Sequence, residues 1–243
     1  MSTDRSGRWA GLVLATAWLA ACQPVSGEQN DRPETARAFP RADRPVADVV
    51  SNEFSNEEAR DDRNEASTVM DLAGIQPGMT VADIGAGNGY YTVRLAERVG
   101  AKGRVLAQDI DDAALKRLGT RVERERLDNV SIKPGDIDDP RLPEASFDRV
   151  FMVHMYHEVT EPYAFISRLR PALKKGGQVI VVDVDRQTNR HGMPPKLLFC
   201  EFEAVGYKLV EFIEKPDIAG YFARFEAVGP ALEPSKIKGC DQP

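Results

Sequence analysis

The sequence predicts an α/β domain with an open, doubly wound sheet, and three observations carry this prediction. Apolar runs of strand length alternate with segments of helix length between residues 81 and 205. Several runs are apolar throughout, which is typical of parallel strands that helices cover on both faces. A glycine loop, Gly85-Ala86-Gly87-Asn88-Gly89, separates the first strand of this series from the helix after it. Sheets of this class bind ligands at the carboxyl ends of their strands, where such a loop lies.

The elements follow from capping, periodicity and turn signals. Ser55-Asn56 is a capping-type start for a helix over residues 59–73, and Pro77-Gly78 marks a turn. Strands are predicted at 81–84, 103–109, 130–133, 147–153 and 178–184, and helices at 92–99, 111–126, 162–173 and 196–205. Residues 207–214 and 221–228 form two further strands. The connection between them is too short for a parallel crossover, so we expect them to pair antiparallel.

The N-terminus has the organisation of a secretory signal peptide. Arg5 and Arg8 precede an uncharged apolar stretch, residues 9–21, that is too short to span a bilayer. It ends in Leu19-Ala20-Ala21-Cys22, which resembles the lipobox of bacterial lipoproteins. The resemblance implies export and a lipidated Cys22 that anchors the chain in a membrane, and Gln23 favours the outer membrane or its periplasmic face. The alternative is a cytoplasmic protein with an N-terminal extension.

The segments on either side of the globular domain differ from it in composition. Residues 23–50 carry four prolines among polar and charged residues, so a flexible linker is predicted there. With residues 1–22 as the signal peptide, this linker would tether a domain over residues 51–230. Residues 231–243 are predicted to form an irregular tail.

Charge and cysteine content exclude some classes of function. The net charge is −6 and no long basic run is present, which argues against a nucleic-acid partner. The three cysteines, at 22, 200 and 240, form no C-x-x-C pair, so we predict no metal site. An oxidising compartment would permit a disulfide between Cys200 and Cys240. Because one lies on a predicted helix and the other in the tail, we do not expect them to pair.

Acidic residues fall at the carboxyl ends of the first three strands. Asp83 closes the first strand, Asp109 closes the second, and Asp136 follows the third. The two carboxylate oxygens of Asp109 suit both hydroxyls of a ribose. Asp136 would accept from an adenine amine, with the amide of Ile137 at the ring edge. The alternative for each acid is a solvated residue at a strand end or turn.

These motifs resemble the class I S-adenosylmethionine-dependent methyltransferases over about residues 55–228. The first motif of that family matches Asp83-Ile84-Gly85-Ala86-Gly87-Asn88-Gly89, and its fourth-strand motif matches Phe147-Asp148-Arg149-Val150. The resemblance implies a Rossmann-like sheet of seven strands, mostly parallel with an antiparallel final strand, and S-adenosyl-L-methionine as the methyl donor. The donor-binding residues that it implies are Asp83, Gly85, Ala86, Gly87, Asn88, Gly89, Tyr91, Asp109, Ile110, Asp136 and Ile137.

The sequence is also compatible with two other functions. A nicotinamide-dependent oxidoreductase fits less well, because the loop has the spacing G-x-G-x-G and Tyr90 occupies the place of the third glycine. The second alternative is a membrane-tethered module that binds the donor without turnover. The signal peptide motivates it, because the methyl donor is made in the cytoplasm.

The candidate catalytic residues follow the fourth strand, in His154-Met155-Tyr156-His157-Glu158. Methyl transfer is an in-line displacement in which alignment supplies most of the acceleration, so a base is needed only if the acceptor must lose a proton. Histidine suits that role near neutral pH. We predict His157 as the first candidate and His154 as the second, with Tyr156 as an orienting hydroxyl and a small molecule as acceptor. The alternative is that these side chains are structural.

Overall fold

The structure is a computed structural model of the 243-residue chain, and it describes residues 1, 31–47, 56–218 and 220–241. The chain divides into a unit Met1–Asp31, of which Met1 and Asp31 are described, and a unit Arg32–Pro243. The predicted signal peptide and Cys22 therefore lie outside the described residues. None of the helices in the described part of the chain has the length and apolar character that crossing a bilayer requires.

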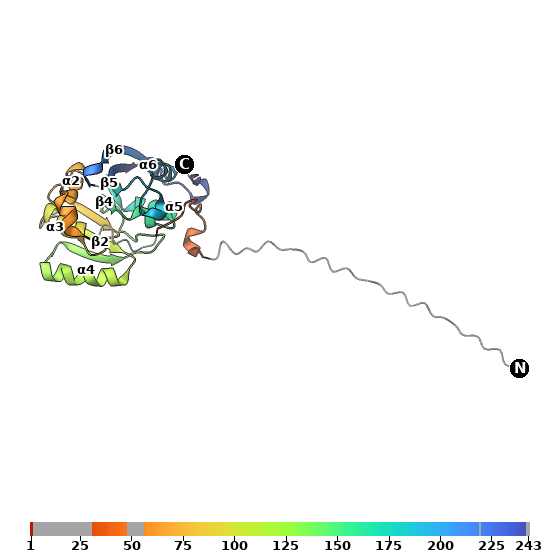
Figure 1. Ribbon diagram of the computed structural model, residues 1–243, viewed down its shortest axis with the longest axis horizontal. Helices are drawn as coiled ribbons and strands as arrows, with labels where there is room; N and C mark the ends of the chain where they lie inside the picture. The colour runs from red at the N-terminus through yellow and green to blue at the C-terminus, as the bar shows by residue number, and fades with distance from the viewer. Residues whose placement is uncertain (2–30, 48–55, 219, 242–243) are drawn as a thin grey trace. The chain divides into compact units, whose positions relative to one another are not determined.

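A seven-stranded sheet forms the centre of the described part of the second unit (Figure 1), in the order β3-β2-β1-β4-β5-β7-β6. The strands are β1 (Thr80–Ile84), β2 (Arg104–Asp109), β3 (Val130–Pro134), β4 (Phe147–Val153), β5 (Leu173–Asp183), β6 (Tyr207–Lys215) and β7 (Gly220–Ala227). Strands β1 to β5 pair parallel, whereas β7 is antiparallel to both β5 and β6. The predicted fold class is confirmed, and so is the antiparallel pairing of the last two strands.

Helices cover both faces of this sheet (Figure 1). They are α1 (Glu57–Asp62), α2 (Glu65–Leu72), α3 (Tyr90–Val99), α4 (Asp112–Glu125), α5 (Pro162–Leu169) and α6 (Pro195–Ala204). Alternate residues of β5 enter different apolar clusters because side chains of a strand alternate between its faces. Val179 and Val181 pack in the cluster that contains α5 and α6, and Ile180 and Val182 in the cluster that contains α2 and α3. This division makes the sheet doubly wound.

The strand order reverses between β1 and β4, and this position determines where a ligand can bind. The chain moves outward from β1 through β2 to β3, and then returns to place β4 on the opposite side of β1. The connections after β1 and β4 therefore diverge, which leaves a crevice at the carboxyl ends of these strands. The glycine loop follows β1, and the histidine-containing segment follows β4.

Two predicted helices differ from those in the structure. The helix predicted over residues 59–73 is divided into α1 and α2, because Asn64 adopts the left-handed conformation with φ of 52°. Asn56 caps α1 as expected, since its side chain accepts from the amide of Ala59. The helix predicted to reach residue 173 ends at Leu169 and continues as a short 3-10 helix, Arg170–Ala172. Pro171 lacks the amide hydrogen that a longer α-helix would need there.

The prediction of a flexible linker is wrong for residues 32–47. This segment forms a short 3-10 helix, Glu34–Ala36, and packs on the domain with Ala36 and Ala47 buried. The guanidinium of Arg32 donates to both carboxylate oxygens of Glu161, at 2.7 and 2.6 Å. Composition predicted a solvated segment because arginine side chains are mostly exposed in folded proteins. Arg32 instead meets a buried carboxylate from a distant part of the chain.

The C-terminal tail is also tied to the domain, and the expectation about its cysteine is wrong. Cys240 forms a disulfide with Cys200 of α6. The amide of Cys240 donates to the hydroxyl oxygen of Tyr163, and Ile237 packs in the same apolar cluster as α5 and α6. The two cysteines are 40 residues apart in the sequence, so only the fold of the tail onto these helices brings them together.

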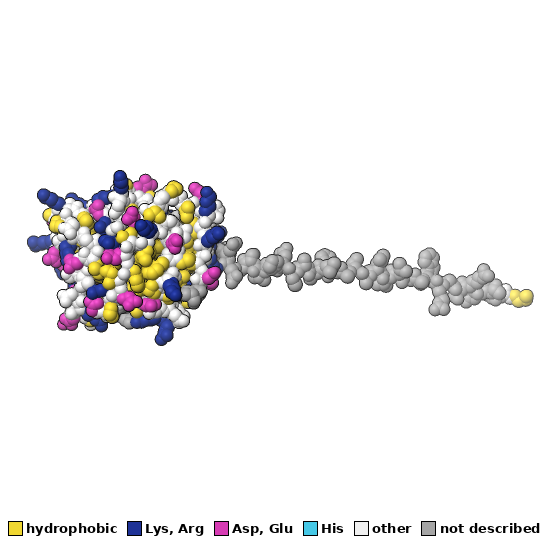
Figure 2. All heavy atoms as spheres, turned by 90° about the horizontal axis from the view of Figure 1, so that it is seen from above, with side chains coloured by type: hydrophobic (Ala, Val, Ile, Leu, Met, Phe, Trp, Pro, Cys, Tyr) yellow, Lys and Arg dark blue, Asp and Glu magenta, His cyan; other side chains and the backbone are white. Residues whose placement is uncertain are grey.

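Strand β6 is an outer strand of the sheet and leaves part of its surface open. Val210 on this strand is 40% exposed. Figure 2 shows the face seen from above in Figure 1, where hydrophobic side chains gather among charged ones. Strand β6 carries Lys208, Glu211, Glu214 and Lys215. Charged residues of this kind protect an outer strand against pairing with other chains.

Candidate functional site

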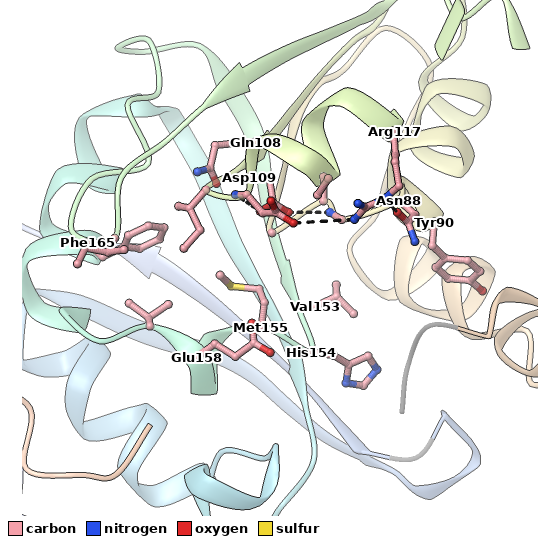
Figure 3. A pocket seen from close by; sticks show the side chains of 18 of the residues that line it. Asn88, Tyr90, Gln108, Asp109, Arg117, Val153, His154, Met155, Glu158 and Phe165 are labelled. Carbon is pink, nitrogen blue, oxygen red and sulfur yellow. Dashed lines mark hydrogen bonds and ion pairs between the residues drawn. The ribbon is translucent and has the colours of Figure 1, made fainter. Parts of the chain in front are cut away.

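A cavity of about 620 Å³ lies at the carboxyl ends of β1, β2 and β4. In Figure 3, Asn88 and Asp109 lie on one side of it, and Met155 and Glu158 lie on the opposite side. Eight of the eleven predicted donor-binding residues line it: Gly85, Ala86, Gly87, Asn88, Asp109, Ile110, Asp136 and Ile137. The sequence prediction therefore identified eight of the residues that line the cavity.

Asp109 is fixed at this wall by the backbone around it. The amide of Gly87 donates to one of its carboxylate oxygens at 2.8 Å, and the amide of Asp111 donates to the other at 3.0 Å. Each oxygen still has a lone pair that a ligand hydroxyl can use. The close approach of the loop depends on glycine. A Cβ at Gly85, whose φ is +67°, would lie 2.9 Å from Cγ of Met155 and collide with that side chain.

Three predicted donor-binding residues do not line the cavity and have structural contacts instead. Asp83 is buried beneath the loop and accepts from Oγ1 of Thr92 at 2.6 Å. Burial raises the pKa of Asp83 to about 6, although the hydrogen bond from Thr92 opposes this shift. Gly89 precedes α3 as its N-cap with φ of +87°. The hydroxyl of Tyr91 donates to Oε1 of Glu65 at 3.1 Å. These contacts hold the loop and the start of α3 in place.

Arg60 of α1 lines the cavity, and sequence reasoning missed it. Its guanidinium lies 3.8 Å from the ring centroid of Tyr90, the first residue of α3, and 2.6 Å from Oε1 of Glu65. A positive side chain therefore lies beside the N-terminus of α3, which itself carries a partial positive charge. Glu65 balances the charge of Arg60, so the N-terminus of α3 is the feature on this side that suits an anionic group. No sequence motif could reveal Arg60, because only the packing of α1 against α3 brings it there.

Glu65 is buried and links two residues that line the cavity. Its Oε1 accepts from Arg60 and lies 3.5 Å from Nε2 of His154, and both of these residues line the cavity. Burial raises the pKa of Glu65, but the contacts with His154 and Arg60 outweigh burial and hold that pKa at about 2. Glu65 is therefore a buried carboxylate that remains ionised near neutral pH.

The other two candidate catalytic residues, Tyr156 and His157, do not line the cavity. Tyr156 is fully buried, and its hydroxyl donates to Oε2 of Glu201 at 2.7 Å. His157 is also fully buried, with Nδ1 2.9 Å from Oδ2 of Asp183. Its Nε2 lies 3.8 Å from Oε1 of Glu158, which does line the cavity. Among the three predicted candidates, only His154 reaches the cavity directly, and a catalytic role for any of them stays a prediction.

The loop after β5 brings a third histidine to this side. The ring centroids of His157 and His191 are 5.6 Å apart. One ligand atom each from His157, Glu158 and His191 lies within 4.8 Å of the other two. Burial raises the pKa of Glu158 to about 7, although the neighbouring His157 opposes this shift. The prediction of no metal site considered cysteine spacing alone, whereas these residues are a candidate metal-ligand group within the described chain.

Comparison with known proteins decides the family. A family model for a methyltransferase domain matches residues 75–211, which are more than half of the chain. The chain belongs to this methyltransferase domain family. The matched region of the methyltransferase domain contains the glycine loop, Asp109, Asp136 and all three histidines.

The curated relatives of the methyltransferase domain are similar to it over part of their length. The ubiquinone/menaquinone biosynthesis C-methyltransferase UbiE of Shewanella sp. (strain ANA-3) is 30% identical over 118 residues, which are 48% of this chain and 47% of that protein. The protein of the same name from Idiomarina loihiensis is 31% identical over 119 residues, with 48% and 47% covered. The chain thus spans about half the length of the curated relatives it matches.

Solved structures share the fold of the methyltransferase domain at lower identity. A SAM-dependent methyltransferase from Aquifex aeolicus has a TM-score of 0.60 at 21% identity, over 70% of this chain and 96% of that one. A SAM-dependent O-methyltransferase from Thermotoga maritima has a TM-score of 0.52 at 21% identity, over 70% of this chain and 67% of that one. At these identities the likeness concerns the fold alone.

Proposed function

We propose that the methyltransferase domain binds S-adenosyl-L-methionine in this cavity and transfers its methyl group to a small molecule. The observation that carries the proposal is the carboxylate of Asp109, held at the cavity wall by the amides of Gly87 and Asp111. In this arrangement it accepts hydrogen bonds from both ribose hydroxyls of the donor. Asp136 and Ile137 line the adjoining wall, where the adenine would lie.

The amino-acid end of the donor would lie in the part of the cavity beside the start of α3. Its carboxylate would meet the N-terminus of α3 and the guanidinium of Arg60. The methyl group would then face the side formed by Met155, Glu158 and Phe165. In the reaction, the acceptor atom forms a bond to the methyl carbon while the carbon–sulfur bond breaks. The bonding electron pair returns to sulfur, which leaves neutral S-adenosylhomocysteine.

Cavity size supports a small acceptor. Pockets for small molecules have volumes of about 300–1,000 Å³, and the cavity of about 620 Å³ must hold the donor as well. Little enclosed volume remains for the acceptor, so a compact group would enter beside Glu158.

Calorimetry with S-adenosyl-L-methionine tests donor binding. The full-length chain, purified in a mild detergent, is expected to bind the donor, and Asp109→Ala is expected to weaken binding by about 100-fold. This estimate assigns about 1.5 kcal/mol to each of two hydrogen bonds from a charged acceptor. Asp112→Asn removes a neighbouring acid that does not line the cavity and should leave the affinity unchanged. Absence of binding at millimolar donor would overturn the proposal. Acceptors are then screened with methyl-labelled donor.

We also propose that Cys22 is lipidated and that the domain lies outside the cytoplasm, anchored to a membrane. The apolar stretch before the lipobox supports export, and so does the disulfide between Cys200 and Cys240, because such bonds persist in oxidising compartments. Metabolic labelling with palmitate should mark the wild-type chain and not the Cys22→Ala variant. Equal labelling of both chains would contradict the anchor, and Cys200→Ala controls for the loss of a cysteine elsewhere.

A further inference from the structure

The region formed by His157, Glu158 and His191 is called the histidine side of the cavity. Within the part of the chain that the structure describes, one buried ring nitrogen of each of these two histidines has no hydrogen-bond partner. These atoms are Nε2 of His157 and Nδ1 of His191. A buried polar atom without a partner costs about 1–3 kcal/mol and is rare in folded proteins. These nitrogens lie on two residues of one compact group, because one ligand atom each from His157, Glu158 and His191 lies within 4.8 Å of the other two. One ion bound between them would satisfy both nitrogens and the carboxylate.

We propose that His157, Glu158 and His191 bind a divalent transition-metal ion of the zinc class. Two imidazoles and one carboxylate are the donor set that Zn²⁺ and its neighbours accept, whereas Mg²⁺ and Ca²⁺ favour oxygen ligands alone. Three protein ligands leave a fourth position of a tetrahedral ion open to a water molecule or a substrate. The ion would lie close to the cavity, because Glu158 lines its wall.

Asp183 prepares His157 to be a ligand. Its carboxylate oxygens lie 2.9 and 3.1 Å from Nδ1 of His157, and the amide of Val184 donates to the same carboxylate at 2.8 Å. An ionised carboxylate only accepts, so the neutral ring carries its proton on Nδ1 and presents a lone pair at Nε2. Histidines that bind metals commonly have such a carboxylate partner on the other ring nitrogen. The orphaned nitrogen is thus the one that is chemically ready to bind an ion.

The backbone around the group is held by a distant segment. Arg44 is buried and donates to the carbonyl oxygens of His157 and Val159, which fixes the turn after β4. Oγ1 of Thr188, in the loop that presents His191, donates to the carbonyl oxygen of Pro45 at 2.5 Å. His191 keeps a left-handed backbone with φ of +54°. Residues 44 and 45 therefore position both halves of the site before any ion arrives.

Zinc titration tests the site. The full-length chain, purified in detergent without a polyhistidine tag, is stripped with a chelator and titrated with Zn²⁺ against a chromogenic chelator. One Zn²⁺ per chain is expected, and Mg²⁺ should not compete. His157→Ala and His191→Ala should each abolish stoichiometric binding. Asp183→Asn should weaken it about 10–100-fold, the usual effect of removing a partner of a ligand.

His154→Ala is the matched control. The chain contains three histidines, and His154 lies outside the proposed group. This variant loses an imidazole near the same cavity and should keep wild-type zinc affinity. Circular dichroism verifies that each variant is folded. Co²⁺ supplies a second readout, since a site of low coordination number gives visible absorption bands that His191→Ala should remove and His154→Ala should retain.

The proposal is overturned if the wild-type chain takes up no stoichiometric Zn²⁺, or if folded His157→Ala and His191→Ala bind it as tightly as wild type. A loss in His154→Ala as large as in His191→Ala would also overturn it. These titrations contain no methyl donor. Their failure would leave donor binding intact, and failure of the donor calorimetry would leave a zinc result standing, so the two proposals are tested separately.

Discussion

The two sides of the cavity differ in how the chain builds them. The donor side comes from short stretches at the ends of neighbouring strands, residues 85–88 after β1 and 109–111 after β2. The histidine side takes His157 from the turn after β4 and His191 from the loop after β5, and it depends on a buried ion pair between Arg44 and Glu201. Those last two residues are 157 positions apart. Local sequence thus specifies one side, and long-range contacts assemble the other.

Removal of Arg44 should cause the largest loss of stability among these variants, because it breaks a buried ion pair. The change should affect the histidine side alone. Nε of Arg44 lies 2.8 Å from Oε1 of Glu201, and both side chains are buried. Arg44→Ala leaves that carboxylate without its charge partner and removes donors from the backbone carbonyls of Tyr156 and His157. Breaking a buried pair in this way costs about 3–5 kcal/mol. Denaturant unfolding of the full-length chain measures the loss.

Arg37→Ala is the control for this prediction. Arg37 lies in the same N-terminal segment and is exposed, so its replacement should change the free energy of unfolding by at most about 0.5 kcal/mol. If Arg44→Ala and Arg37→Ala lose equal stability, residues 32–47 do not support the histidine side as described. Donor affinity of the folded Arg44→Ala variant should remain close to wild type, because the donor side does not contact Arg44.

Reduction of the disulfide should have the next largest effect. The Cys200–Cys240 bond closes a loop of 40 residues, for which loop-closure entropy gives a stabilisation of about 4 kcal/mol and measured effects are typically about 2–4 kcal/mol. Cys200→Ser combined with Cys240→Ser should lower the free energy of unfolding by about 3 kcal/mol. A reducing agent should shift the unfolding midpoint of wild type and not that of the double variant. An unchanged wild-type midpoint would contradict this prediction.

Glu65 contacts both Arg60 and His154, and its contribution to the free energy of unfolding should depend on pH. The pKa of this carboxyl lies at about 2 in the folded chain, below the value of 4.5 for an unpaired glutamate. The unfolded chain therefore binds the proton more readily, so the stabilisation is complete above about pH 5 and disappears as the pH falls towards 2. A shift of this size corresponds to at most about 3 kcal/mol.

The measurement is the difference in unfolding free energy between wild type and Glu65→Gln, followed across this pH range. The other acids titrate in both chains and cancel in that difference. The gap should be largest near neutral pH and shrink in acid as Glu65 takes up its proton. A gap that stays constant from about pH 3 to pH 7 would show that Arg60 and His154 do not act on this carboxyl through its charge.

The same contrast explains what the sequence predicted and what it missed. The strands, the glycine loop and Asp109 were predicted because each signal lies within a few consecutive residues. Arg60 was missed since the packing of α1 brings it to the cavity, and His191 was not linked to His157 because their proximity follows from the pairing of β4 with β5. The linker prediction failed for a similar reason. Composition cannot show that Arg44 has a buried partner 157 residues away.

The smallest effect should come from the backbone that directly follows the donor side. Gly89 and Gly74 both have positive φ, +87° and +66°, so alanine at either position costs about 1 kcal/mol of backbone strain. A Cβ at Gly89 would also lie 2.5 Å from Cδ1 of Leu118, whereas a Cβ at Gly74 would have no atom of the described residues within 4 Å apart from its chain neighbours. Gly89→Ala should therefore lose about 2 kcal/mol in denaturant unfolding, and Gly74→Ala about 1. Because Gly89 caps the helix that begins beside the cavity, only Gly89→Ala should weaken donor binding. Equal stability and equal donor affinity in the two variants would mean that the donor side tolerates displacement of its loop, and the contrast with the histidine side would fail.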